Sequence, residues 1–454
     1  MHHAKPHLTA SLLAALLLAA CSSTPEAPAI NHPAVASIDK YVVSIPASAQ
    51  LPYDGAYVAA FGKTMTFAPG SGLTYRGKDA EGRLLFYGIG DRGPNGDSPK
   101  AFVGEKSFAS KVFPVPGFIP RFAEIVVTPG KGAALTRTVP IGFDSGPASG
   151  LPIASGKTGS TGEVALTDKL ATLGFDANGI DPESIAIDKD GNLWISDEYG
   201  PFLMKLDRNG NVLAKYEPGK GLPAIIGSRQ PNRGFEGATV TPSGKIVAVV
   251  QSTLDVDGKT KDSATFTRIV ELDPKTGTTR QFAYSIDMTH YLKSGDAKLG
   301  DIVAIDDTHF ALIDQGAGKK GMRNLIVIID IAGATDISNI QAAGGKALEY
   351  ATPAELAAVK FVRAQTLLDM RDLGWTPEKT EGLAIVDGKL AVINDNDFGI
   401  SSSVAGDKGD KMSAYAIRDG KVSDNGRYSL APNGENTQLW ILTLRAPLAS
   451  YFPK

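Results

Sequence analysis

The stretch DPESIAIDKDGNLWISDEYGP, residues 181–201, contains two apolar runs on either side of a tight turn. In both runs apolar residues alternate with small or polar ones, which is the period of a β-strand. Asp190-Gly191 between the runs is a typical two-residue turn, because Gly tolerates the positive φ that such turns need. The stretch therefore predicts a β-hairpin, with Glu183 before its first strand and Asp197 and Glu198 after its second.

The pattern of an acidic residue, a short strand, a turn glycine and a second strand recurs along the chain. Clear copies contain Glu236 and Glu381, a weaker copy contains Asp301, and another copy starts at Gly70 and ends in Asp91-Arg92. Repeated hairpins of this kind predict blades around a common axis. We expect an all-β propeller of four-stranded blades, with five units readable directly and a sixth blade shared by the N-terminal strands and the C-terminus.

Two segments depart from the repeated strand pattern. Apolar residues over 353–373 have helical spacing, and Thr352 with Glu355 has the signature of a capping box. We therefore expect one inserted helix near 353–373. A polar insertion of about residues 399–436 is expected to interrupt the last blade, which then finishes within residues 438–446.

The N-terminus has the features of a bacterial lipoprotein signal. An apolar run over residues 12–20 is too short to span a bilayer and ends before Cys21, the one cysteine of the chain. We expect a signal peptide over 1–20, lipid attachment at Cys21, a flexible tether over 21–40 and the propeller domain over 41–449. This predicts anchoring in the bacterial cell envelope, at the outer membrane if the cell is Gram-negative. An ordinary secretory peptide with an incidental cysteine is the alternative.

Composition narrows the classes of function. The chain has 454 residues and a formal net charge of −3, and it contains no basic stripe or run of Lys and Arg. A nucleic-acid partner is therefore not expected. The 50 Gly and 28 Pro suit an all-β protein with many turns, and one cysteine allows no internal disulfide.

The acidic residues of the repeats form the candidate site. The inner strands of a propeller end at its central channel, so we expect a ring of carboxylates there. Hard oxygen donors suit Ca²⁺, which takes six to eight oxygen ligands. The expected metal ligands are Glu183, Asp197, Glu236, Glu381 and Asp395. The alternative is that each acidic residue caps its own blade by accepting backbone N–H groups.

Several pieces of the chain, in order, resemble a known family. They are IGDRGP (89–94), DPESIAI (181–187), WISDEYGP (194–201), NRGFEGATV (232–240) and EGLAIVDGKLAVINDND (381–397). They are similar to the phytase-like family described as having "esterase-like activity of phytase", over roughly residues 65 to 445. The resemblance implies an exported β-propeller and a hydrolase of phosphoester or ester bonds. The sequence departs from the family at ALIDQGAGKKG (311–321), where such proteins often carry an acidic–basic pair.

The first functional hypothesis is a Ca²⁺-dependent hydrolase of a small phosphoester or ester. Arg92 and Arg233 are the expected substrate-binding residues, because a guanidinium group can pair with two phosphate oxygens. Asp197 or Glu198 is the expected general base, acting on a metal-bound water. The alternative for the arginines is ion pairing with nearby carboxylates.

Three other hypotheses remain open. A non-catalytic propeller could bind a ligand or an envelope partner, since one fold hosts many functions. A lactonase-like calcium propeller would use the Asn394-Asp395 pair. A serine hydrolase would need His290 or His309 as its base, but the chain has no G-x-S-x-G motif. Cations facing the acidic residues favour phosphoester chemistry, whereas an apolar or aromatic face favours binding.

Overall fold

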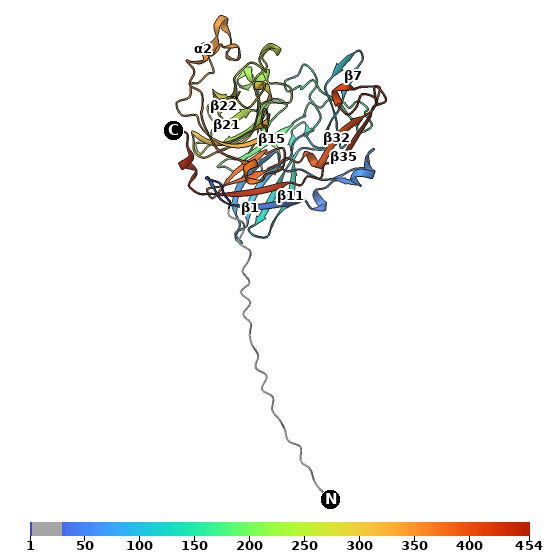
Figure 1. Ribbon diagram of the computed structural model, residues 1–454, viewed down its shortest axis with the longest axis horizontal. Coiled ribbons are helices and arrows are strands. Elements are labelled where there is room, and N and C mark those ends of the chain that lie inside the picture. Colours follow the sequence, from blue (N-terminus) through green and yellow to red (C-terminus); the bar gives the residue numbers. More distant parts are fainter. Residues whose placement is uncertain (2–29) are drawn as a thin grey trace.

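The chain folds into an all-β structure (Figure 1), described here from a computed structural model for Met1 and residues 30–454. The predicted signal peptide after Met1, the lipidation of Cys21 and residues 21–29 of the predicted tether lie outside the described residues. Residues 35–40 of that tether instead belong to the strand β1 (Val35–Ser44). Within the described part of the chain, no helix has the length and apolar character needed to cross a bilayer.

Most strands belong to four-stranded antiparallel units. The first unit contains β4 (Gly72–Lys78), β5 (Leu84–Ile89), β10 (Arg121–Thr128) and β11 (Gly132–Pro140). The second contains β15 (Pro182–Ile187), β16 (Leu193–Asp197), β17 (Phe202–Leu206) and β18 (Val212–Pro218), with the short β19 (Gly221–Leu222) at its edge. The third contains β20 (Phe235–Val240), β21 (Ile246–Val250), β22 (Phe266–Asp273) and β23 (Thr278–Ser285). The fourth contains β24 (Lys298–Ala304), β25 (His309–Gly318), β26 (Gly321–Asp330) and β29 (Arg363–Asp369).

The last unit joins the two ends of the described chain. It contains β30 (Gly382–Val386), β31 (Lys389–Ile393), β36 (Gln438–Leu444) and β1 (Val35–Ser44). The N-terminal strand β1 pairs with β36 along most of its length and touches β11 through only two residue pairs. The expected sixth blade is therefore not found among residues 30–454. Its N-terminal and C-terminal strands instead complete the unit that starts after Glu381.

The first strands of the five units lie next to each other in a closed ring. β4 contacts β15 and β30, and β20 contacts β15 and β24, while β24 contacts β30. Apolar clusters fill the spaces between adjacent units. Along β21, Ile246, Ala248 and Val250 pack on one side and Val247 and Val249 on the other. Because both faces of each sheet are covered, the sequences of strands such as β21 are almost continuously apolar.

The expected helix over 353–373 is wrong apart from its first turn. α2 covers only Pro353–Leu356, and the capping box of Thr352 and Glu355 is confirmed. Residues 363–369 instead form β29, which pairs with β26. The outer edge of β26 presents N–H and C=O groups that need partners, and this requirement overrides the helical spacing of the apolar residues.

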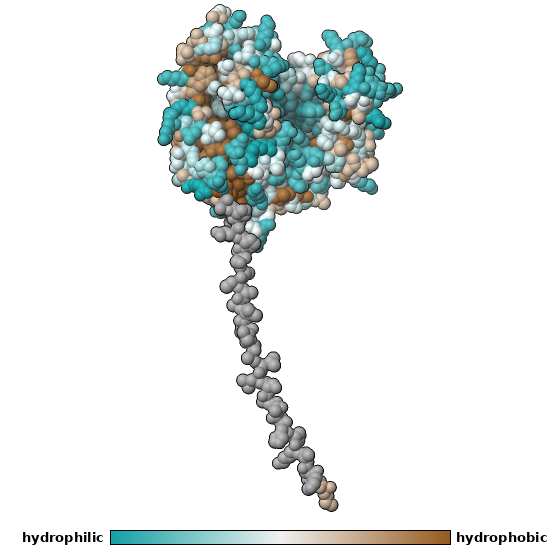
Figure 2. Space-filling view, in the orientation of Figure 1, coloured by the Kyte–Doolittle hydropathy of each residue, from teal (hydrophilic) through white to brown (hydrophobic). Residues whose placement is uncertain are grey.

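A second lobe lies beside the ring (Figures 1 and 2). It is built from loops of the first and last units and from the connection between the first and second units, and it includes the polar insertion predicted over 399–436. Its strands are β6 (Gly96–Asp97), β7 (Lys100–Val103), β8 (Lys106–Phe108), β9 (Ser110–Val112), β14 (Val164–Leu166), β32 (Ile400–Ala405), β33 (Ala416–Arg418), β34 (Lys421–Val422) and β35 (Arg427–Pro432). Figure 2 shows a hollow with hydrophilic residues between this lobe and the rest of the molecule.

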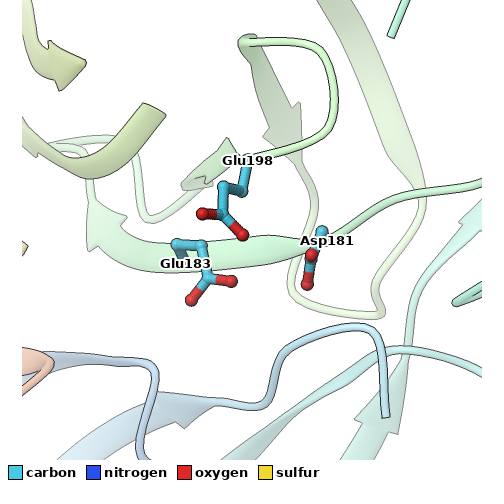
Figure 3. A group of neighbouring side chains, drawn as sticks. All are labelled: Asp181, Glu183 and Glu198. Carbon is cyan, nitrogen blue, oxygen red and sulfur yellow. The ribbon is translucent and has the colours of Figure 1, made fainter. Parts of the chain in front are cut away.

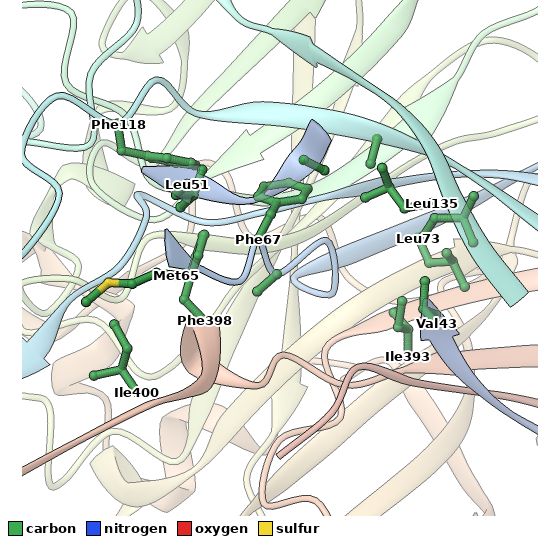
Figure 4. Packing of buried hydrophobic residues seen from close by; sticks show 14 of the residues in the cluster. Val43, Leu51, Met65, Phe67, Leu73, Phe118, Leu135, Ile393, Phe398 and Ile400 are labelled. Carbon is green, nitrogen blue, oxygen red and sulfur yellow. The ribbon is translucent and has the colours of Figure 1, made fainter. Parts of the chain in front are cut away.

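The largest apolar cluster holds the second lobe against the ring. Figure 4 shows part of it, in which Phe67, just before the first unit, and Phe118, from a loop of that unit, meet Phe398 and Ile400 at the start of the insertion. Phe398 makes edge-on contacts with both other rings. The cluster also takes in the short strands β2 (Leu51–Pro52) and β3 (Thr64–Met65) and neighbours α1 (Val58–Phe61). The walls of the hollow are thus fixed by a packed core.

Candidate functional site

The hairpin of β15 and β16 places the first acidic residues of the site. Its turn has Gly191 at a φ of +81°, as the Asp-Gly signal predicts. Pro182 pairs with Asp197 and Ser184 with Ser196, so the register shifts at Glu183 as in a β-bulge. A bulge turns one side chain away from the normal alternation. Glu183 thereby faces the centre of the ring.

The same shift recurs at the next repeat. Phe235 pairs with Val250 and Gly237 with Val249, which leaves Glu236 unpaired. Packing requires glycine at the next position, because a Cβ atom at Gly237 would lie only 2.7 Å from the carbonyl oxygen of Gly300 on β24. The repeated Glu-Gly pair therefore combines an inward carboxylate with close approach of the neighbouring inner strand.

Three carboxylates gather at one side of the ring centre. Asp181 and Glu183 flank the start of β15, and Glu198 follows β16 (Figure 3). Each offers an oxygen atom that lies within 4.8 Å of those of the other two, and all three side chains are buried. Asn232 donates to Glu198 at 2.7 Å and Gln251 donates to it at 2.9 Å. The three form a compact set of hard oxygen donors.

These residues line a charged cavity of about 370 Å³ at the ring centre. Ten acidic and five basic side chains line it. The structure brings the predicted Glu183, Glu198, Glu236, Glu381 and Asp395 together there, with the predicted Arg92 and Arg233. The excess of acidic groups means that an anionic ligand would be repelled unless a cation bound beside it.

Burial and mutual repulsion disfavour ionisation of these acidic residues. Burial, and then the carboxylates of Asp181 and Glu236, raise the pKa of Glu183 well above its ordinary value. Burial raises the pKa of Glu198 to about 8 and that of Glu381 to about 7. A carboxylate cluster with raised pKa values is typical of a functional site.

The donor set fits a hard divalent cation such as Ca²⁺. Asp181, Glu183 and Glu198 supply three carboxylates at a mutual spacing that ligands of one ion can adopt. Beside them the buried Gln251 gives both of its N–H groups to Glu198 and Glu236, while its carbonyl oxygen has no hydrogen-bond partner. A buried carbonyl oxygen without a partner is unfavourable, and a bound cation would satisfy it. We find no cluster of His or Cys ligands among residues 30–454.

The two predicted arginines have different surroundings. Arg92 is only 4% exposed and forms salt bridges with Glu163 at 3.2 Å and Asp181 at 3.5 Å. The ion-pairing alternative therefore describes Arg92 well. Arg233 forms no salt bridge within the described residues, and it contacts the hydroxyl of Ser252 at 3.0 Å and the carbonyl of Gly295. Its charge is left available to the cavity.

Asp197 does not line the cavity. Its two carboxylate oxygens accept the backbone N–H groups of Asp181 and Gly200, each at 2.8 Å, and its side chain is fully buried. Asn394 also points elsewhere, because its amide pairs with the backbone of Asn436 and Gln438. The structure thus separates Asp197 and Asn394 from the predicted site residues that do share the cavity.

Asp301, at the repeat position of Glu183, also lies outside the cavity. One of its oxygens accepts the N–H of Leu383 at 3.0 Å and that of Leu73 at 3.5 Å, and the other accepts the N–H of Ile302 at 2.9 Å. Leu383 belongs to β30 and Leu73 to β4. Asp301 thus ties three inner strands together, as the capping alternative proposes.

Sequence reasoning missed Asp181, Lys298 and Lys379, which also line the cavity. A signal for two of them was present. Asp181 stands two residues before Glu183, and Lys379 stands two residues before Glu381. In both cases a second charged residue lies with the glutamate at the start of the same inner strand, and this closeness along the chain is the signal. Lys379 donates to Asp395 at 2.7 Å and to Asp397 at 2.6 Å.

Fold and site together define an all-β protein with a ring of four-stranded sheets around a charged cavity. The sequence model of the phytase-like family, "Esterase-like activity of phytase", matches residues 67–398. The chain belongs to this family, as the resemblance predicted, and the matched range includes every cavity residue named above.

Other similarities are more limited. A protein of Arthroderma benhamiae named "Uncharacterized secreted protein" is 31% identical over 138 residues, which are 24% of this chain and 27% of that protein. Among solved structures, virginiamycin B lyase from Staphylococcus aureus matches 90% of this chain and 100% of its own, at 9% identity and a TM-score of 0.29. A luciferin-regenerating enzyme matches 83% and 92% respectively, at 10% identity and a TM-score of 0.33.

Proposed function

We propose that this protein is a Ca²⁺-dependent hydrolase of phosphoesters that acts in the central cavity. The observation that carries the proposal is the arrangement of charges. Asp181, Glu183 and Glu198 form a compact carboxylate set. Arg233 and Lys298, which form no salt bridge within residues 30–454, line the same cavity. A phosphoester needs both, because a metal ion and fixed cations together balance its charge.

Asp181, Glu183 and Glu198 are the proposed holders of the ion, with Glu236 and Gln251 next to them. When bound, Ca²⁺ would supply positive charge that polarises a phosphoryl oxygen. The same charge would keep the surrounding carboxyls ionised, because a nearby cation lowers the pKa values that burial has raised. Arg92 supports the set indirectly, since its salt bridge and backbone N–H fix Asp181.

Glu381 is the proposed proton acceptor. It is buried, it lines the cavity, and its pKa of about 7 lies near the operating range of a general base. In the proposed step a water oxygen forms a new P–O bond as the ester P–O bond breaks. The water proton passes to Glu381, and the leaving alkoxide takes a proton from Glu381 or solvent. The products are an alcohol and phosphate.

The character of the cavity wall favours this proposal over an apolar binding site. Charged and amide side chains make up its lining. The lactonase-like alternative loses its motif residue Asn394, which is bound to the backbone near β36. For the fold, we propose a five-bladed propeller, in which each of the five units described above is one blade.

The envelope location remains part of the proposal. The apolar run before Cys21 supports export and lipid attachment, and the Arthroderma benhamiae relative is named as a secreted protein. A lipid anchor would place the cavity outside the cytoplasm, where Ca²⁺ is more abundant. Labelling of the full chain with a radioactive fatty acid, compared with Cys21→Ser, tests the anchor directly.

The hydrolase proposal is tested with 4-nitrophenyl phosphate and the full chain. We expect turnover in Ca²⁺, none in chelator, and a fall in kcat of about 10²-fold or more in Glu381→Gln, which can no longer accept a proton. Glu81→Gln is a matched control, because Glu81 is an exposed acidic residue that pairs with Arg83. Equal turnover in Ca²⁺ and in chelator, or no turnover of any phosphoester, would contradict the proposal.

A further inference from the structure

A second cavity of about 340 Å³ adjoins the carboxylate cavity. The two share a wall made of five residues, Arg233, Lys298, Glu378, Lys379 and Glu381. Their combined size is in the range of small-molecule sites, whereas a phosphate group would fill only part of the first cavity. The second cavity is therefore free to hold the rest of a substrate.

The shared wall carries two cations that form no salt bridge within residues 30–454, although both lie near enough to Glu198 to lower its pKa. Arg92, Lys111 and Lys379, the other cations of the carboxylate cavity, each form a salt bridge. Within residues 30–454, Arg233 and Lys298 form none. Lys298 is the first residue of β24 and pairs in register with Gln315, so its backbone is fixed by the sheet.

The side chain of Arg233 is also fixed at the shared wall. Its Nη1 atom donates to the hydroxyl of Ser252 and the carbonyl of Gly295, three residues before Lys298. Both contacts use Nη1, which leaves Nε and Nη2 for a ligand. A guanidinium with a free edge beside an unpaired ammonium group is a suitable site for a phosphoryl group.

The rest of the lining of the second cavity differs in character. Ala317 and Met322 face each other as a cross-strand pair near the end of the β25–β26 hairpin, and both line the cavity. Asp296 also lines the second cavity, and Glu378 lines both cavities, so their carboxylates would repel a second anionic group. This combination suits an uncharged and partly apolar group.

We infer that the second cavity binds the leaving group of an organic phosphate monoester, and that Arg233 and Lys298 hold its phosphoryl group at the shared wall. The inference rests on the proposed function for the reaction itself, but its binding part stands without turnover. The substrate class is an alkyl or aryl phosphate with an uncharged leaving group, in preference to a polyphosphate.

Phosphonates test the inference without hydrolysis, because their C–P bond stays intact. We would measure the affinity of the Ca²⁺-loaded full chain for phenylphosphonate and methylphosphonate by calorimetry. Phenylphosphonate should bind at least fivefold more tightly. Lys298→Met should weaken both ligands at least tenfold, whereas Lys131→Met, an exposed lysine at the β10–β11 turn, should change neither.

Met322→Asp separates the two halves of the site. It should remove the preference for phenylphosphonate by weakening that ligand more than methylphosphonate, because the new carboxylate repels both phosphonates but displaces only the phenyl group. The melting temperature checks folding. Equal binding of both ligands by the wild type, or unchanged binding by Lys298→Met and Met322→Asp, would overturn the inference. If these binding results hold but no ester is hydrolysed, the hydrolase proposal fails and the two-part site remains.

Discussion

Glu183 and Asp301 occupy the same position in two repeats, yet their carboxylates have different surroundings and different roles. Both stand where the strand register shifts at the start of an inner strand. Glu183 has no hydrogen-bond partner in the described protein and lines the cavity with other carboxylates, whereas Asp301 accepts three backbone N–H groups and lies outside it. The comparison teaches that a repeated acidic residue becomes a ligand candidate only where the backbone does not use its oxygens.

Side-chain length explains part of the difference. The shorter aspartate keeps its carboxylate beside the backbone, within reach of the N–H groups of β4 and β30. Glutamate adds one methylene group, which carries the carboxylate past the strand and into the ring centre. At the same repeat position, Asp therefore favours a structural cap and Glu favours a cavity wall.

The largest expected effect is structural. Asp301→Ala should lower the free energy of unfolding by about 3 kcal/mol or more, because three buried backbone N–H groups lose their acceptor. Urea unfolding in Ca²⁺ and in chelator measures this, and the loss should be the same in both. Asp301→Asn keeps one acceptor oxygen and should cost less. A loss below about 1 kcal/mol for the alanine variant would contradict the capping role.

Glu183→Gln should have the opposite profile. In chelator its stability should equal or exceed that of the wild type, because a buried acidic group with close acidic neighbours is removed. In Ca²⁺ it should lack a stabilisation of about 2.7 kcal/mol, the value expected at a 100-fold excess over Kd. The comparison of unfolding curves in Ca²⁺ and chelator checks both parts. A full Ca²⁺ response in this variant would remove Glu183 from the ligand set.

The pH dependence of stability should differ between the metal-free and the Ca²⁺-bound protein. Glu198 and Glu381 have pKa values of about 8 and 7 in the folded metal-free protein, above their ordinary value of 4.5. These two groups then bind more protons in the folded state than in the unfolded state. Their contribution to stability in chelator should be complete below pH 4.5 and be lost as the pH rises through 7 to 8. Ca²⁺ should reduce this fall, since it binds the ionised carboxylates. Melting temperatures across this range, measured with and without Ca²⁺, test the sign.

The smallest expected effect is that of Asp197→Asn. The variant keeps one acceptor oxygen for the N–H groups of Asp181 and Gly200, so a loss of about 1 kcal/mol is expected. Its Ca²⁺-dependent stabilisation should stay close to that of the wild type, because Asp197 does not line the cavity. A loss of the Ca²⁺ response as large as in Glu183→Gln would restore Asp197 as a predicted ligand.

The local parts of the structure could be predicted from the sequence. Turn glycines and alternating apolar residues located the hairpins of the repeats, and the position of Glu183, Glu236 and Glu381 before inner strands placed them in one cavity. These signals are local, because turn chemistry and side-chain alternation depend on neighbouring residues.

Long-range pairing accounts for what could not be predicted. β1 completes the last unit through β36, about 400 residues later, and β29 forms because the edge of β26 needs a partner. Asp197 was assigned to the site because it ends an inner hairpin, but its carboxylate turns to the backbone of its own loop. Lys298 belongs to the cavity only because β24 adjoins β20 and β30, which no local pattern indicates.

The central claim is that the carboxylate set of Asp181, Glu183 and Glu198 binds Ca²⁺. Its most direct test is calorimetric titration of the chelator-treated full chain with Ca²⁺, beside the same titration of Glu183→Gln. We predict saturable binding by the wild type, with proton release as the carboxyls ionise, and loss of that binding in the variant. No binding by the wild type, or equal binding by both proteins, would contradict the claim and return the repeated glutamates to a structural role.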